Sequence, residues 1–206
     1  MGRLAVLDQP AEPRSAAEDR AAEVLMTAAD LIYRNGFDAT SMNKIAKAVK
    51  LTKAGLYYYT KGKGDLLYKI ISFAMDCVER DIIGPCCKIE DAEERLHQII
   101  VRHLETIFLT SGAITVLTEE VNKLSAPQRR TIIARKRRYL DLVRDTLCEL
   151  DKAGRLRHID RTVAALNLFS TILGVARWYD PKGRFSSDRV SSETVHFIVS
   201  GLLKDD

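Results

Sequence analysis

The chain has 206 residues, which is enough for one or two domains with a sizeable hydrophobic core. Its 32 basic and 28 acidic residues leave a formal net charge of only +4, so any strongly basic surface must be local. No apolar run approaches the length of a membrane span, and the N-terminus lacks the apolar core of a secretory signal. These features argue against a membrane partner and predict a cytoplasmic protein.

The first predicted helix follows a segment without hydrophobic period, residues 1–15, which we expect to be a mobile arm. Ser15-x-x-Glu18 is a capping box, and Asn35-Gly36 is a typical helix end. Between these signals one face of the helix is apolar, and it consists of Ala21, Val24, Leu25, Ala28, Leu31 and Ile32.

Two short helices separated by a tight turn are predicted next. Thr40 or Ser41 is placed to cap the first helix, whose apolar face holds Ile45, Ala46 and Val49. Thr52 is placed to cap the second helix, and Leu56 would point back into a small core. Lys50 and Leu51 alone remain for the turn.

This stretch, from Ala39 to Gly64, is locally basic and rich in tyrosine. It contains three consecutive tyrosines, no acidic residue and six lysines at positions 44, 47, 50, 53, 61 and 63. A lysine that reaches a phosphate releases counterions, and a tyrosine hydroxyl can donate to a phosphate oxygen. On one lysine-bearing helix alone, a solvated face would be the better interpretation. The combination of turn, caps, tyrosines and missing acids instead predicts a helix-turn-helix that binds DNA.

Three segments of this stretch resemble the signature of TetR-family regulators: Thr40–Ala46, Thr52–Tyr59 and Lys61–Leu67. The resemblance implies an all-α, ligand-responsive DNA-binding protein, usually a repressor, that binds a palindromic operator as a homodimer. By position, it places Lys53, Ala54 and Gly55 near base edges and makes Leu56 and Tyr58 packing residues. The residues it implies at phosphates are Thr40, Ser41, Tyr57, Tyr59 and Lys63, and Lys44 and Thr52 complete the predicted DNA-binding set.

The sequence departs from the family pattern at two positions. Lys50 stands where glycine is usual in the turn, and a side chain in a left-handed conformation costs roughly 1 kcal/mol. Either the turn is adjusted, or the cost is accepted for another phosphate contact. Thr60 stands where a large apolar residue is usual.

We assign residues 16–64 to the DNA-binding domain and 65–206 to a ligand-binding and dimerisation domain, about nine helices in all. A connecting helix over 65–83 is expected to end at Gly84-Pro85 and to act as the lever between ligand and DNA. Its apolar face is Leu66, Leu67, Ile70, Ile71, Ala74 and Val78.

The next helix starts at Asp91-x-x-Glu94 and carries His103 on its apolar face. A hydrogen-bonded core or interface histidine is favoured there over a ligand contact. Residues 112–124 are expected to form a short helix or turn. A long helix then runs from the capping box Ser125-x-x-Gln128 to Gly154.

On this long helix, Lys136 is expected to project into the apolar stripe, with Arg135 at its edge. Four successive cations, residues 135–138, cannot all face solvent on the outer side. Either their stems lie along apolar surface with the charged heads in water, or one or two heads line the mouth of a pocket and bind an anion.

The last two helices, over residues 160–179 and 187–203, are expected to pack against their copies in a second subunit, because the first is apolar nearly all round. The predicted dimer contacts are Leu166, Phe169, Trp178, Val195, Ile198, Val199 and Leu202.

The segment Gly174–Pro181 resembles a branch of the family that often governs lipid catabolism and responds to acyl-CoA thioesters. That resemblance implies an apolar tunnel for an acyl chain and cations for the CoA phosphates. The ligand-binding set is Ile100, His103, Leu104, Phe108, Leu117, Arg135, Lys136, Tyr139, Val143, Phe169, Leu173 and Arg177. For Arg177 and Trp178, a hydrogen-bonded helix end at the dimer interface is an equally good interpretation.

No catalytic motif, cofactor motif or metal-ligand spacing is present in the sequence. The four cysteines, at positions 77, 86, 87 and 148, are expected to be free thiols, with a redox switch at Cys86 as the minor alternative. We therefore predict no enzyme, no cofactor and no metal. Two alternatives remain: a regulator that responds to a hydrophobic drug or other metabolite, and a helical lipid-binding protein that does not act on DNA.

Overall fold

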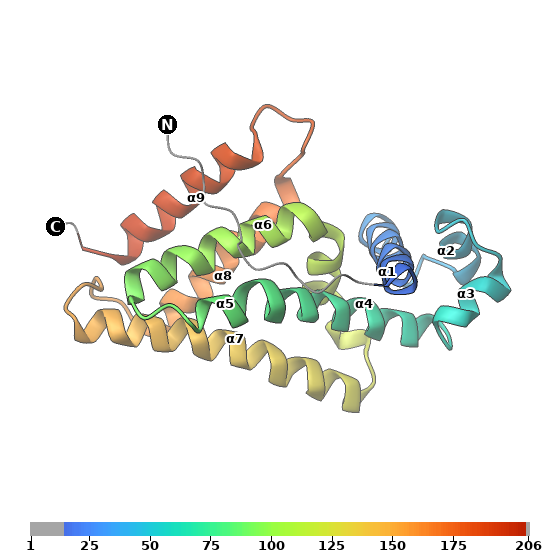
Figure 1. Ribbon diagram of the computed structural model, residues 1–206, viewed down its shortest axis with the longest axis horizontal. Helices are drawn as coiled ribbons and strands as arrows, with labels where there is room; N and C mark the ends of the chain where they lie inside the picture. The colour runs from blue at the N-terminus through green and yellow to red at the C-terminus, as the bar shows by residue number, and fades with distance from the viewer. Residues whose placement is uncertain (1–14, 205–206) are drawn as a thin grey trace.

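The computed structural model describes residues 15–204, and the predicted arm, apart from Ser15, lies outside them. The described chain is all-helical apart from turns and one isolated bridge between Leu156 and Leu203, as expected. Figure 1 shows α1, α2 and α3 grouped at one end, and α4 leading from them into the other helices. The helices are α1 (Ala16–Asn35), α2 (Met42–Ala48), α3 (Lys53–Tyr59), α4 (Lys63–Val78), α5 (Gly84–Cys86), α6 (Ala92–Glu119), α7 (Ala126–Lys152), α8 (Arg161–Trp178) and α9 (Ser187–Leu202).

The helix ends follow the local signals in the sequence. Both capping boxes form: Ser15 and Glu18 open α1, and Ser125 and Gln128 open α7. Gly36 ends α1 with a φ of 79°, in the left-handed region where glycine is favoured. The side chains that form the predicted apolar face of α1 are buried or half-buried.

The connecting helix does not stop at Gly84-Pro85, so that prediction was wrong. After α4 the chain continues through a π-helical turn, Glu79–Ile83, into α5. The wider turn shifts the hydrogen bonds by one residue, so that the Gly84 N–H donates to the Glu79 carbonyl. Pro85 has no N–H, and the Asp81 carbonyl four residues earlier instead accepts from Arg102, at 3.4 Å.

Helix α6 is bent sharply at Thr110, whose φ of −137° and ψ of 33° are not helical. The two parts, Ala92–Thr110 and Gly112–Glu119, meet at 103°. The short helix expected within 112–124 is therefore present, followed by a 3₁₀ turn at Val121–Lys123. No single helix between residues 15 and 204 is long and apolar enough to cross a membrane; only the two parts of α6 together meet the length and composition.

Helix α6 lies at the centre of the larger domain, in contact with α1, α4, α7, α8 and α9. Its apolar side chains Leu96, Ile99, Ile100, Leu104 and Ile107 are fully buried. Because α6 also contacts α1, the core is continuous from the three-helix end of the molecule to the rest.

Arg135 on α7 joins that helix to the end of α4. Its guanidinium donates to both carboxylate oxygens of Glu79, at 2.9 Å each, and to Asp76 at 2.5 Å. The Arg135 hydrogen bond is the largest influence on the pKa of Glu79 and, against partial burial, holds it below the usual value.

This ion pair makes the stability of the protein depend on pH. Because the pKa of Glu79 is lowered by folding, the pair stabilises above the ordinary pKa of about 4.5 and is lost as pH falls through the folded value. We expect Arg135→Ala to lower the free energy of unfolding by about 1 kcal/mol at pH 7 and by less at pH 3.5. Thermal unfolding at both pH values measures this. Arg138→Ala is the control, because Arg138 is exposed and 3.4 Å from the same carboxylate; an equal loss at both pH values for Arg135→Ala would contradict the assignment.

Candidate nucleic-acid interface and ligand cavity

The turn between α2 and α3 contains a left-handed residue, so of the two alternatives that the sequence left open the turn is not adjusted. Lys50 has a φ of 55°, so the backbone accepts the cost of a side chain in this conformation. The Leu51 N–H donates to the Ala46 carbonyl at 2.9 Å, and Arg20 on α1 donates to the Val49 carbonyl at 3.0 Å. These bonds fix α3 relative to α1 and α2 in the arrangement of a helix-turn-helix.

The lysines of this region fall into two groups. Lys44, Lys47, Lys50, Lys53 and Lys61 are exposed, and none of them has an ion-pair partner among residues 15–204. They form the cationic surface of the helix-turn-helix.

Lys63 is half-buried, unlike these five lysines, of which Lys44 alone has a comparable but longer bond, from its ammonium to the Ala39 carbonyl at 3.5 Å. The Lys63 ammonium donates to the Asp38 carbonyl at 3.1 Å and lies 4.4 Å from the centre of the Phe37 ring. Lys63 therefore braces the loop between α1 and α2, and any phosphate contact would compete with this hydrogen bond.

The N-terminus of α3 is open to a ligand. Thr52 caps it by accepting from the Gly55 N–H at 2.9 Å, and Thr52, Lys53 and Ala54 are exposed. A β-carbon at Gly55 would lie 3.2 Å from the Thr52 hydroxyl, a tight contact that would push on the capping side chain. Ser41 caps α2 in the same way and is also exposed.

Thr40 does not fit the phosphate contact predicted for it. Its side chain is fully buried, and its hydroxyl donates to the Gly36 carbonyl at 2.8 Å. Thr40 therefore ties the end of α1 to the start of α2, and Ser41 alone presents a hydroxyl at this position.

Of the three tyrosines, Tyr58 is placed differently from the prediction. Leu56 is buried as expected, but Tyr58 is 87% exposed and was wrongly assigned to packing. At about 100° per residue, Tyr58 lies some 200° from Leu56, whereas Tyr59 lies within about 60° of it. Tyr59 is accordingly half-buried and Tyr57 is exposed. Sequence reasoning missed Tyr58 as a surface residue, although the helical angle was sufficient to find it.

Thr60, the second departure from the family pattern, is buried and satisfied. Its hydroxyl lies 2.9 Å from both Asp65 Oδ2 and the Gly62 carbonyl. The same carboxylate accepts from the Lys61 N–H at 2.8 Å. Burial alone would raise the pKa of Asp65, but these hydrogen bonds outweigh it and lower the pKa.

A cavity of about 550 Å³, which we call the α4–α8 cavity, lies between α4, α6, α7 and α8. Its walls are mainly apolar, and six of the predicted ligand residues line it: His103, Leu117, Lys136, Tyr139, Phe169 and Leu173. Met75 and Val78 bring the end of α4 into the same wall. A ligand in this cavity would therefore touch the helix that leads directly from α3.

Three cations on α7 line this cavity: Lys136, Arg137 and Arg144. Burial lowers the pKa of Lys136, which has no ion-pair partner within the described part of the chain. Asp141 also lines the cavity and lies 3.7 Å from Arg144. The sequence prediction missed Arg144, although it follows Lys136 and Leu140 at a spacing of four residues along one face.

The remaining six predicted ligand residues do not line this cavity. Ile100, Leu104 and Val143 are fully buried in the core, and Phe108 lines a different groove. Arg135 is held by Asp76 and Glu79, and Arg177 pairs with Glu119 at 2.7 Å. Both arginines are thus paired with acids that are 56 or more positions away in the chain, which no local pattern reveals.

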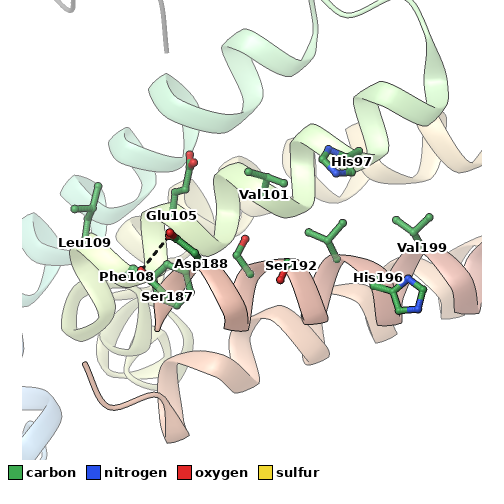
Figure 2. A pocket seen from close by; sticks show the side chains of 12 residues that line it. His97, Val101, Glu105, Phe108, Leu109, Ser187, Asp188, Ser192, His196 and Val199 are labelled. Carbon is green, nitrogen blue, oxygen red and sulfur yellow. Dashed lines mark hydrogen bonds between the residues drawn. The ribbon is translucent and has the colours of Figure 1, made fainter. Parts of the chain in front are cut away.

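The groove lined by Phe108 lies between α6 and α9 and has a volume of about 610 Å³. Figure 2 shows Glu105 and Asp188 at one end and His97 and His196 at the other. Among the residues that the structure describes, no lysine or arginine lines this groove. Its acidic end would repel a phosphate-bearing ligand, so the α4–α8 cavity is the better candidate for one.

The predicted dimer contacts are only partly on the surface. Leu166 and Trp178 on α8 are 51% and 58% exposed, as an interface requires. Val195, Ile198 and Leu202 are buried within the protomer, so the assignment of these three to the interface was wrong; Phe169 and Val199 are half-buried. The exposed apolar residue of α9 is instead Phe197, at 68%, which the prediction missed.

A helix-turn-helix with an unneutralised cationic surface, joined through one helix to a helical domain with an apolar cavity, defines a DNA-binding transcription regulator. Residues 90–202 match the family model for the tetracyclin repressor-like C-terminal domain, and residues 24–70 match that for bacterial regulatory proteins of the tetR family. The chain belongs to the TetR family. As a member of this family it is a DNA-binding transcription regulator and not an enzyme.

Its relatives include regulators with lipid-related names. The transcriptional repressor KstR2 of Rhodococcus jostii strain RHA1 is 27% identical over 94% of this chain and 96% of its own length. The fatty acid metabolism regulator protein of Bacillus subtilis strain 168 is 23% identical over 87% of this chain and 94% of its own length. Among solved structures, AibR in complex with isovaleryl coenzyme A and operator DNA is 30% identical, with a TM-score of 0.78 over 86% of this chain and 97% of that one.

Proposed function

We propose that this protein represses transcription as a dimer on a palindromic operator and is released when an acyl-CoA thioester occupies the α4–α8 cavity. The observation that carries the proposal is the combination of an apolar cavity with Lys136, Arg137 and Arg144 along it. An acyl group suits the apolar wall, and the CoA phosphates suit the cations. The AibR complex with isovaleryl coenzyme A and operator DNA supports the proposed response to an acyl-CoA.

The proposed DNA contacts lie on the surface of the helix-turn-helix. Lys53, Ala54 and the half-buried Gly55 approach base edges at the start of α3. The exposed residues that approach phosphates are Ser41, Lys44, Lys47, Lys50, Tyr57, Tyr58 and Lys61. A repressor of this kind works beside the chromosome, so a cytoplasmic location belongs to the same proposal.

The dimer face is proposed to be the outer side of α8 and α9. Leu166, Trp178 and Phe197 are exposed large apolar side chains on these two helices, and burying them against a second copy removes apolar area from water. Sedimentation velocity tests this, and a monomer at micromolar concentration in the absence of DNA would contradict it.

The proposed coupling passes through α4. Met75 and Val78 line the cavity near one end of this helix, and Lys63 braces the loop before α2 at the other. A ligand that shifts α4 moves α3 with it and changes the spacing of the two recognition helices. Ligand and DNA then favour different conformers, so each weakens the binding of the other by the same factor.

The cations give a specific test of the effector class. We expect the double change Arg137→Glu and Arg144→Glu to raise the acyl-CoA concentration that gives half-release from DNA by at least about tenfold, because it replaces attraction to phosphates by repulsion. Operator affinity should stay within about twofold. Fluorescence anisotropy of labelled operator DNA, titrated with octanoyl-CoA, measures both.

The matched control is Arg130→Glu with Lys152→Glu, the same change in charge at two exposed positions of α7 that do not line the cavity. Its half-release concentration should be that of the wild type. Equal behaviour of the two double variants would contradict the cationic site and favour an uncharged hydrophobic effector.

A further inference from the structure

His103 and Tyr139 form a buried polar pair in the wall of the α4–α8 cavity. His103 is 3% exposed and Tyr139 is 6% exposed, and both line the cavity. The Tyr139 hydroxyl lies 3.1 Å from His103 Nδ1. Phe169 packs against both rings, with centroids 6.1 Å from His103 and 4.9 Å from Tyr139.

The second ring nitrogen of this histidine has no hydrogen-bond partner. Within residues 15–204, Tyr139 is the single group with which His103 forms a hydrogen bond, and that bond uses Nδ1. Nε2 is not one of the fully buried unpartnered atoms, and His103 lines the cavity. A polar atom of a largely buried side chain that no protein group meets costs free energy unless a ligand or water meets it. Such an atom in a cavity wall is suited to receive a polar atom of a ligand.

Both members of the pair are uncharged at neutral pH. Burial lowers the pKa of His103 to about 4 and raises that of Tyr139. In one tautomer Tyr139 donates to Nδ1 and the Nε2–H of His103 is a free donor. In the other, Nδ1–H donates to Tyr139, which leaves Nε2 as an acceptor and the tyrosine O–H as a donor. Either way the pair presents a neutral donor and a neutral acceptor.

A neutral donor and a neutral acceptor in the cavity wall favour an effector with an uncharged polar group at this position. We propose that the acyl part of the effector carries an uncharged oxygen, a ketone or a hydroxyl, which the His103–Tyr139 pair binds. The inference rests on the proposed acyl-CoA response of the same cavity. A ketone accepts from the free N–H or O–H, and a hydroxyl uses the donor and the acceptor together. A carboxylate would instead pair with Lys136, which lines the same cavity without an ion-pair partner among the described residues.

The test compares thioesters of equal length: octanoyl-CoA, 7-oxo-octanoyl-CoA and 8-hydroxyoctanoyl-CoA, titrated into the protein bound to labelled operator DNA. We expect at least one oxygenated thioester to release the wild type at a concentration about 5- to 100-fold lower than octanoyl-CoA. His103→Phe and Tyr139→Phe keep an aromatic ring in the cavity wall, so both should fold and bind DNA. In each variant we expect the preference itself to be lost, measured as the ratio of the half-release concentrations of octanoyl-CoA and of the oxygenated thioester on that same variant. Equal response of the wild type to all three thioesters would overturn the inference and leave the proposed function intact.

The thioester carbonyl is a competing partner for the pair. If His103 binds that carbonyl, His103→Phe weakens the response to all three thioesters by the same factor, which also overturns the inference.

If no thioester releases the wild type, the proposed function fails, and the polar pair is tested without CoA. Thermal stabilisation by cyclohexanone is then compared with that by methylcyclohexane, which has a similar volume. A stabilisation specific to the ketone and absent from His103→Phe supports the pair as an oxygen site. Equal stabilisation by both compounds overturns it.

Discussion

Replacing Lys47 and Lys53 together by glutamate is expected to lower operator affinity by about 100- to 1000-fold at 0.1 M salt. Both lysines are exposed on the helix-turn-helix, and neither has an ion-pair partner among the described residues. Each contact with a phosphate contributes about 0.9 to the slope of log affinity against log salt, so the slope should fall by about 2. Anisotropy titrations at four salt concentrations give both quantities.

The control for this variant is Arg130→Glu with Lys152→Glu, which changes the net charge equally on α7. A general charge effect would weaken binding by both double variants alike. The interface is contradicted if the two variants have the same affinity and the same salt slope.

Replacing Gly112 by valine is expected to destabilise the protein and weaken its binding to DNA. A β-carbon at this position would lie 2.1 Å from Asp30 Oδ1, which can rotate away, and 3.1 Å from the Asp30 backbone N and Cα, which cannot. Helix α1 must then move away from the second part of α6. We expect the free energy of unfolding to fall by about 1–3 kcal/mol, the usual cost of overpacking.

The effect on DNA binding follows from the position of α1. Arg20 on α1 donates to the Val49 carbonyl at the turn, so a displaced α1 displaces the helix-turn-helix. Gly64→Val is the matched control, because a β-carbon there meets nothing within 4 Å. Chemical denaturation and operator titration of both variants measure the outcome. An unaltered midpoint and unaltered affinity for Gly112→Val would show that this close approach is not present.

The sequence predicted what depends on neighbouring residues. The capping boxes at Ser15 and Ser125 are local features, and both are confirmed. The sequence also marked Lys50 as the unusual turn residue but left open whether the turn would adjust, and the structure shows that Lys50 is left-handed. The cavity residues His103, Lys136 and Tyr139 could be predicted because each falls on the apolar face of its helix, α6 for His103 and α7 for the other two. The Tyr58 error was avoidable, since the helical angle from Leu56 already placed it outward.

The remaining features depend on contacts between segments far apart in the chain. Arg135 was predicted to be a pocket cation because the neighbouring sequence gives no sign that Asp76 and Glu79 form ion pairs with it. Val195 and Phe197 are both apolar residues of α9, and only the packing of α9 on α6 decides which one is buried. The bend at Thr110 likewise brings Gly112 against Asp30 on α1, which no helical period in α6 indicates.

The central claim is that an acyl-CoA thioester and operator DNA compete through one conformational change. The most direct measurement is fluorescence anisotropy of the protein on its own upstream DNA, titrated at fixed salt with CoA and with short-, medium- and long-chain acyl-CoAs. We expect at least one acyl-CoA to release the protein from this DNA at concentrations where free CoA has no effect. Firm binding that no thioester changes would contradict it.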